Sequence, residues 1–258
     1  MMPLRTVVAT RYVTPLREGG SLPAIVEADD QGLYVLKFRG AGQGVNALIA
    51  ELVAGEVARA LGLRVPEIVL IELDPALART EPDPEIQHLI RASAGLNLAL
   101  DYLPGSVAFD PLAERPSAEL ASAIVWFDAY VMNVDRTPRN TNMLMWHRQL
   151  WLIDHGAALY FHHHWDGGSE RAQDAFAPIK DHVLLARAER LHDIDATSVA
   201  RLAPDVITRI VDLIPDGWLA DAGDAAARRR AYTQFLQQRL QAPRAFVEEA
   251  IRARSLHV

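Results

Sequence analysis

The pattern of hydrophobic and polar positions divides the chain into a first part made of strands and a second part made mainly of helices. In the first part, apolar residues form short runs bounded by turn residues, which is typical of β-strands. The predicted strands cover residues 5–12, 24–27, 33–38 and 67–73. Apolar residues at helical spacing predict one helix, over residues 46–61. We expect the strands to form a small antiparallel sheet.

Helical periodicity dominates the second part. An apolar run over residues 96–103 ends at Pro104, and there we place the boundary between an N-lobe of residues 1–103 and a C-lobe of residues 104–258. The predicted C-lobe helices cover residues 117–132, 198–213, 225–240 and 243–253, with one more opening at Asp181. Strands first and helices later predict an α+β fold with two lobes and a cleft between them.

A short hairpin interrupts the helices of the second part. The preceding helix breaks at Asn133, and Pro138 rules out its continuation through the polar loop that follows. Two apolar runs, over residues 142–146 and 149–153, come next and are separated by two polar residues. This arrangement predicts a β-hairpin.

Three oxygen-bearing side chains lie at the ends of this hairpin. Asp135 and Asn140 precede its first strand, and Asp154 follows its second. Because the two strand ends lie side by side, we expect these side chains to converge. Two carboxylates and an amide oxygen suit Mg²⁺ that carries a polyphosphate. Asp and Asn also form ordinary turns, but three of them in this order around one hairpin favour the metal site.

Lysine is rare in this chain, which makes Lys37 informative. Of the 26 basic residues only two are lysines, Lys37 and Lys180. Lys37 ends a predicted strand, and a compact ammonium group can reach a phosphate from inside a cleft, whereas arginine is a rigid fork. For a single lysine, an ordinary surface position is the alternative.

Glu51 lies on a stripe of the predicted helix whose other members are apolar: Ala47, Ala54, Ala58 and Leu61. A carboxylate on such a face is costly unless a cation meets it. We predict that Lys37 is this cation, because a strand lysine paired with a helix glutamate orients ATP phosphates in kinases. A half-solvated position at the helix edge is the alternative for Glu51, and Glu56 is predicted to be exposed.

Two glycine-rich segments and a hinge complete the candidate nucleotide site. Gly19, Gly20 and Ser21 form a predicted turn whose backbone N–H groups would suit a phosphate, although an ordinary hairpin turn explains them equally well. Residues 39–44, with the sequence RGAGQG, form either a lid or a connector. At the lobe boundary, the backbone of Asp101, Tyr102 and Leu103 is placed to bind an adenine edge.

Composition excludes several classes of protein. The formal net charge of −7 argues against direct nucleic-acid binding. No apolar run approaches the length of a membrane span, and the beginning of the chain does not resemble a signal peptide. The absence of cysteine excludes disulfides and thiolate metal sites. We therefore expect a globular cytoplasmic protein with no membrane contact.

Taken together, the motifs resemble the HipA-like kinases, in particular the short members that lack the extra N-terminal subdomain. The matching segments are YVLKF, the AEL of the following helix, LDYLPGS, NVDRTPRNTNMLM, LWLIDHGAALYF and KDHVLL, which lie within residues 10–190, and more weakly WL at Trp218. The resemblance implies a protein-kinase-like fold, the use of ATP and Mg²⁺, and phosphorylation of a protein serine or threonine.

The resemblance also implies roles for single residues. Asp135 would be the catalytic base and Lys37 the phosphate contact, with Asn140 and Asp154 as the metal ligands. There are two departures from protein kinases. Asn133 replaces the histidine of the H-R-D motif, and the second residue of the D-H-G segment at Asp154 replaces the phenylalanine of D-F-G. Both are scaffold positions, so the chemistry is not excluded, but regulation by a movable aromatic ring is in doubt.

Alternatives exist for some of these residues and for the activity. Consecutive histidines at residues 162–164 do not suit a metal site with Asp166, so we predict a solvated loop there. Arg136 and Arg139 flank the base and would suit a phosphate or simply the surface. A small-molecule kinase, an AMP-transferase and a nucleotide-binding pseudokinase would use the same constellation. The acceptor, a protein or a small molecule, is not identified by the sequence.

Overall fold

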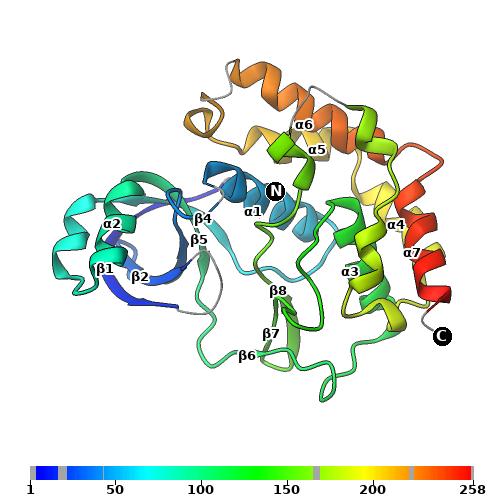
Figure 1. Ribbon diagram of the computed structural model, residues 1–258, viewed down its shortest axis with the longest axis horizontal. Coiled ribbons are helices and arrows are strands. Elements are labelled where there is room, and N and C mark those ends of the chain that lie inside the picture. The colour runs from blue at the N-terminus through cyan, green and yellow to red at the C-terminus, as the bar shows by residue number, and fades with distance from the viewer. Residues whose placement is uncertain (1–3, 17–21, 43, 165–168, 221–223, 257–258) are drawn as a thin grey trace.

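The computed structural model describes residues 4–16, 22–42, 44–164, 169–220 and 224–256. Its first part is a closed barrel of five strands (Figure 1). In the order in which they pair, the strands are β1 (Thr6–Pro15), β2 (Ala24–Ala28), β3 (Leu33–Lys37), β5 (Gly95–Asp101) and β4 (Ile68–Leu73).

The prediction of a small antiparallel sheet is wrong in one respect, because the barrel closes through a parallel pair. Strands β1 and β4 run side by side in the same direction, with Val7 opposite Ile71. A parallel pair needs a crossover connection, and the chain between β3 and β4 supplies it with helix α1 (Val45–Ala60). Closure leaves the barrel without free strand edges.

Residues 74–85, whose prolines and charged residues favour a loop, contain two helical elements instead. These are the 3₁₀ turn η1 (Pro75–Thr80) and the start of helix α2 (Pro84–Ala92). In each case an aspartate, Asp74 or Asp83, caps the first turn through its side chain, and proline occupies the first helical position. Proline is favourable there because its missing N–H would have no partner anyway. The prolines therefore begin helices here and do not exclude them.

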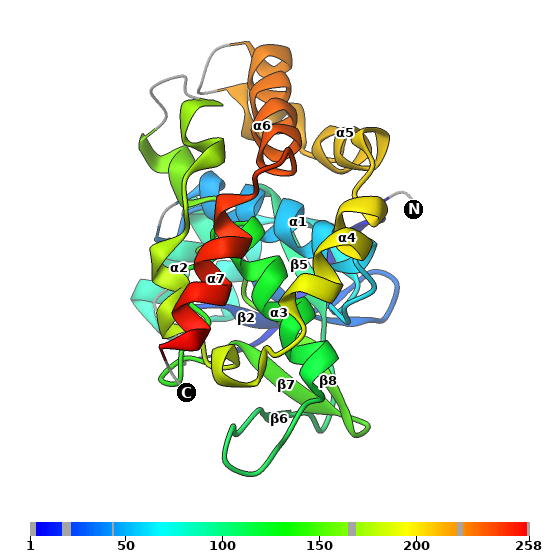
Figure 2. The ribbon, with the colours of Figure 1, turned by 90° about the vertical axis from the view of Figure 1, so that its right-hand side faces the viewer.

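The second part of the chain is helical around one small sheet. The sheet has three strands, β6 (Val107–Ala108), β7 (Met143–Trp146) and β8 (Gln149–Leu152), and β7 and β8 form the predicted hairpin. The helices are α3 (Ala118–Tyr130), α4 (Leu191–Arg201), α5 (Pro204–Asp212), α6 (Ala225–Arg239) and α7 (Ala245–Ser255). Figure 2 shows α3 enclosed by α4 and α7.

Two predicted helices differ from those in the structure. The one expected over residues 198–213 is two helices, because Pro204 begins α5 at its first position and cannot continue α4. The one expected from Asp181 is absent, and that region consists of the 3₁₀ turns η4 (Ala177–Asp181) and η5 (Leu185–Arg187). The aspartate ends a turn there and does not begin a helix.

The apolar interior consists of two clusters. One fills the barrel and includes Val26, Leu36, Val69 and Ala99. The larger one joins α1 to α3 and to the C-terminal helices, and Figure 1 shows α1 lying between the barrel and those helices. Helix α1 thus packs with residues of the second part, so the division of the chain at residue 103 stays a prediction. No helix in the described ranges is long and apolar enough to cross a bilayer.

Arg239 anchors the C-terminal end of α3, from which the polar loop departs. Its fully buried guanidinium donates hydrogen bonds to the carbonyl oxygens of Ala129, Tyr130, Ala172 and Asp174, at 2.8–3.0 Å. Burial lowers the pKa of Arg239 to about 10, so the side chain stays charged at neutral pH. A cation at the negative end of the helix dipole is stabilising, and it fixes the point where the loop begins.

Gly55 allows α1 to lie close against β4. A Cβ atom at this position would lie 2.5 Å from Cδ1 of Ile68. Helix propensity alone favours alanine over glycine by about 1 kcal/mol, but we expect Gly55→Ala to lower the free energy of unfolding by about 1–2 kcal/mol because of this overlap. In an Ile68→Val background, which removes Cδ1, the same substitution should become neutral or stabilising. Urea denaturation of the four proteins measures the difference, and a stabilising Gly55→Ala in the wild-type background would refute the explanation.

Candidate active site

The polar loop after α3 holds Asp135 from both sides. Asn140 donates its side-chain N–H to Asp135 Oδ2 at 2.9 Å. Asn142 donates to the Asp135 backbone oxygen at 2.6 Å and to Oδ2 at 3.3 Å. The backbone N–H of Asp135 donates to Asn133 Oδ1 at 3.1 Å. Four hydrogen bonds thus hold Asp135, two at its carboxylate and two at its backbone, while its side chain stays partly exposed.

Beneath this loop lies a buried carboxylate, that of Asp128 on α3. Its Oδ1 accepts a hydrogen bond from Asn133 Nδ2 at 2.7 Å, and its Oδ2 accepts from Arg136 Nε at 2.6 Å and from His182 Nε2 at 2.9 Å. Burial alone would raise the pKa of Asp128, but the charge of Arg136 and the hydrogen bond from His182 outweigh it and hold that pKa well below its ordinary value. A buried carboxylate is tolerable only when it is paired in this way.

The hairpin links the loop to Asp154. The backbone N–H of Ile153 donates to the carbonyl oxygen of Asn142 at 3.0 Å, and Met143 is paired with Leu152. Asn142, which supports Asp135, therefore lies opposite Ile153, which precedes Asp154. Asp154 has a φ of 55° and Asn142 one of 47°. Non-glycine residues in this left-handed region are sparse and cluster at functional sites.

Lys37 meets Asp154 across the space between β3 and the hairpin. Its Nζ lies 2.7 Å from Asp154 Oδ1, and the side chain of Asp154 is 36 % exposed. Burial lowers the pKa of Lys37, but the charges of Glu51 and Asp154 outweigh that effect and raise its pKa above its ordinary value. The ammonium group is therefore charged at neutral pH, and it faces an acidic side chain that is open to a ligand.

Glu51 has a different partner from the predicted one. It lies on the inner face of α1 and is 1 % exposed, but no ion pair joins it to Lys37. Instead the backbone N–H of His155 donates to Glu51 Oε2 at 2.8 Å, and Nδ1 of the same histidine lies 3.3 Å from Oε1. The direct Lys37–Glu51 pair is thus a wrong prediction. The reason is that Asp154 and His155 are adjacent, so the hairpin end supplies both α1 and β3 with a partner.

Glu56 is a second correction on α1. It was predicted to be exposed, but it is 4 % exposed and forms an ion pair with Arg59 at 2.9 Å. Burial outweighs the effect of Arg59 and raises the pKa of Glu56. Because α1 lies between the barrel and the helices, other elements cover the side of α1 that carries Glu56. The spacing of residues along one helix does not reveal such coverage.

Asn140 and Asp154 were predicted as metal ligands, and their contacts fit an ion that arrives with a nucleotide. Asn140 turns its N–H toward Asp135, which leaves its Oδ1 as an acceptor. Oδ2 of Asp154 has no hydrogen-bond partner among the described residues. No group of three His, Cys, Asp or Glu side chains in the described ranges could hold a metal. Two oxygen ligands are sufficient for Mg²⁺, which takes its remaining ligands from phosphates and water.

The predicted hinge offers one free donor. Asp101 donates its N–H to the carbonyl oxygen of Glu67 at 2.8 Å, and Tyr102 donates to that of Leu33 at 2.9 Å. In the described part of the chain, nothing accepts a hydrogen bond from the N–H of Leu103. Of the three hinge residues, Leu103 is therefore the one whose N–H could bind an adenine edge.

The two glycine-rich segments have different outcomes. Gly19, Gly20 and Ser21 lie outside the described residues, so their predicted contact with phosphate stays a prediction. At the start of the segment of residues 39–44, Arg39 donates its N–H to Asn97 Oδ1 of β5 at 2.8 Å, and Gly40 donates its N–H to Oγ of Ser93, at the end of α2, at 3.1 Å. These bonds favour the connector over the lid.

Burial decides between the alternative positions predicted for Arg136, Arg139 and His162. Arg136 is buried and bound to Asp128, so it supports the loop from below, whereas Arg139 is exposed. His162 is buried, with Nδ1 3.0 Å from the hydroxyl of Tyr232, which corrects the prediction of a solvated loop at that residue. Asp166 lies outside the described residues.

Sequence reasoning missed three residues that support the site: Asp128, Asn142 and His182. Asp128 carried a signal, because it is an acidic residue within the apolar face of the helix that precedes the loop. Asn142 begins an apolar run that predicts a strand, so its side chain gives no signal of a role in the loop. The KDHVLL segment that contains His182 was noted only as part of a resemblance, and a contact between residues 54 positions apart leaves no local pattern.

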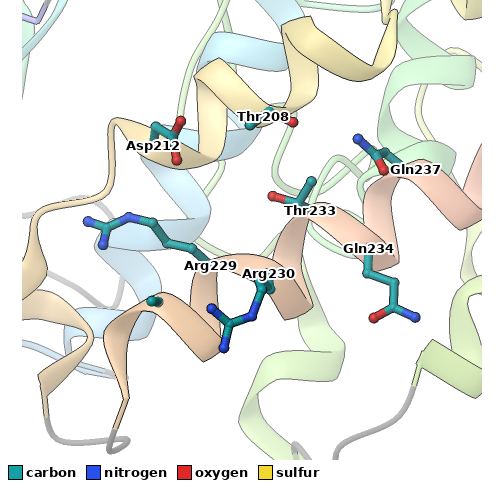
Figure 3. A pocket seen from close by; sticks show the side chains of 8 residues that line it. Thr208, Asp212, Arg229, Arg230, Thr233, Gln234 and Gln237 are labelled. Atoms are coloured by element: carbon teal, nitrogen blue, oxygen red, sulfur yellow. The ribbon is translucent and has the colours of Figure 1, made fainter.

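Two surface cavities lie away from these residues. One, of about 470 Å³, lies between α5 and α6 and is lined by polar side chains including Thr208, Asp212 and Arg230 (Figure 3). The other, of about 400 Å³, lies near the end of α1 and is lined by residues of α3 and α4. Neither contains a predicted site residue, so the candidate site rests on the contacts of Lys37, Asp135 and Asp154.

Comparison with known proteins gives a family and a fold. The sequence profile of the HipA-like kinases matches residues 10–248. No protein with a curated description matches the chain significantly. The crystal structure of CtkA, a proinflammatory kinase of Helicobacter pylori, superposes with a TM-score of 0.55 at 14 % identity and covers 99 % of both chains. That of the Golgi casein kinase with Mn and ADP bound gives a TM-score of 0.49 at 13 % identity, over 95 % of this chain and 74 % of the other. The likeness to the first shows a fold of the protein-kinase type.

The buried carboxylate of Glu51 should make stability depend on acid pH. Burial raises its pKa, but Lys37 and the hydrogen bonds from His155 outweigh burial and lower that pKa from 4.5 to about 2. A lowered folded-state pKa adds stability that is present above pH 4.5 and is lost as the pH falls toward 2. At pH 7 we expect Glu51→Gln to lower the free energy of unfolding by about 2–3 kcal/mol. The deficit should shrink between pH 4.5 and 2 in urea titrations, and a deficit independent of pH would contradict the assignment.

Proposed function

The chain belongs to the HipA-like kinase family, and from this premise we propose that it transfers the γ-phosphoryl group of ATP to a serine or threonine hydroxyl of a protein, with Mg²⁺ as the metal. The family supports a kinase-type phosphotransferase. The choice of Mg²⁺ is supported by the oxygen atoms of Asn140 and Asp154, and the choice of a protein acceptor rests on the resemblance to the HipA-like kinases.

The pairing of Lys37 with Asp154 is the observation that carries the proposal. The two opposite charges lie 2.7 Å apart and satisfy each other. Mg²⁺–ATP presents both complementary charges, phosphate oxygens for Lys37 and a divalent ion for Asp154, so it can replace this contact with two others. Mg²⁺ supplies neutralisation of the phosphate charge when it is bound. Asn140 is the second oxygen ligand in this proposal.

Asp135 is the proposed general base. The residue is held by Asn140 and Asn142, so its carboxylate needs little reorganisation when an acceptor binds. It accepts the proton of the acceptor hydroxyl as that oxygen bonds to the γ-phosphorus, and ADP leaves with the bridging oxygen. Phosphoryl transfer depends mainly on alignment and charge neutralisation, which is what a fixed loop supplies.

The nucleotide is proposed to enter between β3 and the hairpin. In this proposal the N–H of Leu103 donates to the adenine edge, supported by the absence of another acceptor for it among the described residues. Glu51 is proposed to act on Lys37 without touching the nucleotide, since its charge contributes to the raised pKa of Lys37. Its proposed role is to keep the ammonium group charged, which replaces the direct contact that the sequence had suggested.

Isotope labelling tests the reaction and the base together. We expect incubation with γ-labelled ATP and Mg²⁺ to label protein, the enzyme itself or an added protein fraction, and α-labelled ATP to label nothing. Asp135→Asn should lower transfer by about 10²–10⁴-fold, the contribution typical of a general base, because the amide cannot accept the proton. The dissociation constant of ATP, measured by calorimetry, should change less than about threefold, since Asp135 is not proposed to bind the nucleotide.

Asp205→Asn, an exposed change on α5, is the matched control and should transfer like the wild type. Label from α-labelled ATP would indicate AMP transfer instead. Binding of ATP with no label from either nucleotide, and no ADP released, would indicate a nucleotide-binding protein without transfer. Conversion of ATP to ADP without labelled protein would indicate a small-molecule acceptor. Near-wild-type transfer by Asp135→Asn would reject Asp135 as the base.

A further inference from the structure

The segment between the 3₁₀ turns η4 and η5 reaches the underside of the polar loop. It begins with His182, the last residue of a KDH tripeptide whose first two residues end η4, and residues 180–184 together are the KDH segment. His182 is 7 % exposed, and its Nε2 lies 2.9 Å from Asp128 Oδ2. The next residue, Val183, donates its backbone N–H to the carbonyl oxygen of Arg136 at 3.0 Å. Two successive residues of this segment thus contact the support of the loop and the loop itself.

The hydrogen bonds of His182 define which ring nitrogen carries its proton. Nδ1 accepts a hydrogen bond from the backbone N–H of Leu184 at 3.0 Å, so this nitrogen has a lone pair and no proton. The proton of the neutral ring is therefore on Nε2, where it is donated to Asp128. The short turn at Leu184 orients the ring, and the ring in turn contacts α3.

Asp128 passes this contact to Asp135 by two routes. Through Oδ1 it holds the amide of Asn133, whose Oδ1 accepts the backbone N–H of Asp135. Through Oδ2 it holds Arg136, whose Nη1 donates to the carbonyl oxygen of Asn142. Asn142 in turn donates to Asp135. The two routes reach the proposed base from opposite sides.

We propose that His182 is a positioning residue for Asp135, acting through Asp128, and that the KDH segment is thereby a structural part of the phosphotransfer site. The inference rests on the proposed function for its catalytic meaning, but the link from His182 to the loop is a property of the described contacts. His182 itself touches neither the nucleotide nor the acceptor in this account.

The charges of the cluster support a positioning role. Asp128 and Arg136 form a fully buried pair of opposite charges, which fixes their distance and leaves the carboxylate able to accept further hydrogen bonds. The neutral His182 fills one of these acceptor positions without adding charge. Loss of His182 leaves Arg136 as the one partner of Asp128 Oδ2 among the described residues. The carboxylate of Asp128 can then rotate toward the guanidinium and shift Asn133.

Two substitutions separate the two hydrogen bonds of His182. In His182→Asn the side-chain oxygen can still accept the N–H of Leu184, but the shorter side chain does not reach Asp128. In His182→Gln the amide nitrogen extends about as far as Nε2 and can still donate to Asp128. Both residues are polar and neutral, so the two variants differ in which of the two hydrogen bonds of His182 they keep. Thermal unfolding of both variants measures any general loss of stability.

The first readout is amide hydrogen exchange by NMR, which needs no substrate. We expect the amide of Asp135 to exchange about tenfold faster or more in His182→Asn, since its acceptor Asn133 loses its support. In His182→Gln it should exchange like the wild type, and amides of the barrel strands should be unchanged in both. Unchanged exchange of Asp135 in His182→Asn would overturn the inference, and so would equal acceleration in the two variants.

The second readout is transfer from γ-labelled ATP. We expect kcat to fall about 10- to 100-fold in His182→Asn, the scale of a small misplacement of a catalytic group, with the ATP dissociation constant within twofold of the wild type. His182→Gln should retain most of the wild-type kcat. Wild-type kcat in His182→Asn would overturn the inference. If the wild-type protein itself transfers no phosphate, the proposed function fails, and the exchange experiment still decides the link between His182 and the loop.

Discussion

A carboxylate without access to water, that of Asp128, is the constraint on which the site depends. Removal of such a charge from water costs several kcal/mol unless partners replace the lost hydration. Asp128 obtains these partners from Asn133, Arg136 and His182. Each of them comes from a different point of the chain beyond α3, so satisfying one buried charge requires the loop and the KDH segment to take a single arrangement. The loop that carries Asp135 is therefore held on the side that faces Asp128, while Arg139 and Asn140 are exposed to solvent.

The second organising feature is the end of the hairpin, where two adjacent residues bind two different elements. Asp154 pairs with Lys37 of β3, and His155 binds Glu51 of α1. The barrel and its crossover helix are thus both tied to the segment that follows β8. In this arrangement α1 is held without a direct contact between Glu51 and Lys37, because Lys37 pairs with Asp154.

Local chemistry predicted the elements well where one residue decides the backbone, and less well where packing decides. The polar loop that contains Pro138 is not helical, as expected, and the hairpin formed at its predicted position. The prolines near Asp74 and Asp83 misled, because proline at the first turn of a helix is favourable and proline within it is not. The burial of Glu56 could not be foreseen, since it depends on which elements cover α1.

The sequence by itself determined the residue types of the candidate site and their order: a lysine at a strand end, a glutamate on an apolar helix face, and Asp135, Asn140 and Asp154 around one hairpin. These residues can be identified from their spacing along the sequence, because residues at the two ends of one hairpin lie close together in space. Only the tertiary structure decided which charges pair, because Lys37, Glu51, Asp154 and His155 meet across more than a hundred residues. It also decided the contact of His182 with Asp128. A buried charge takes the nearest partner that the packed chain supplies, and sequence spacing contains no information about that distance.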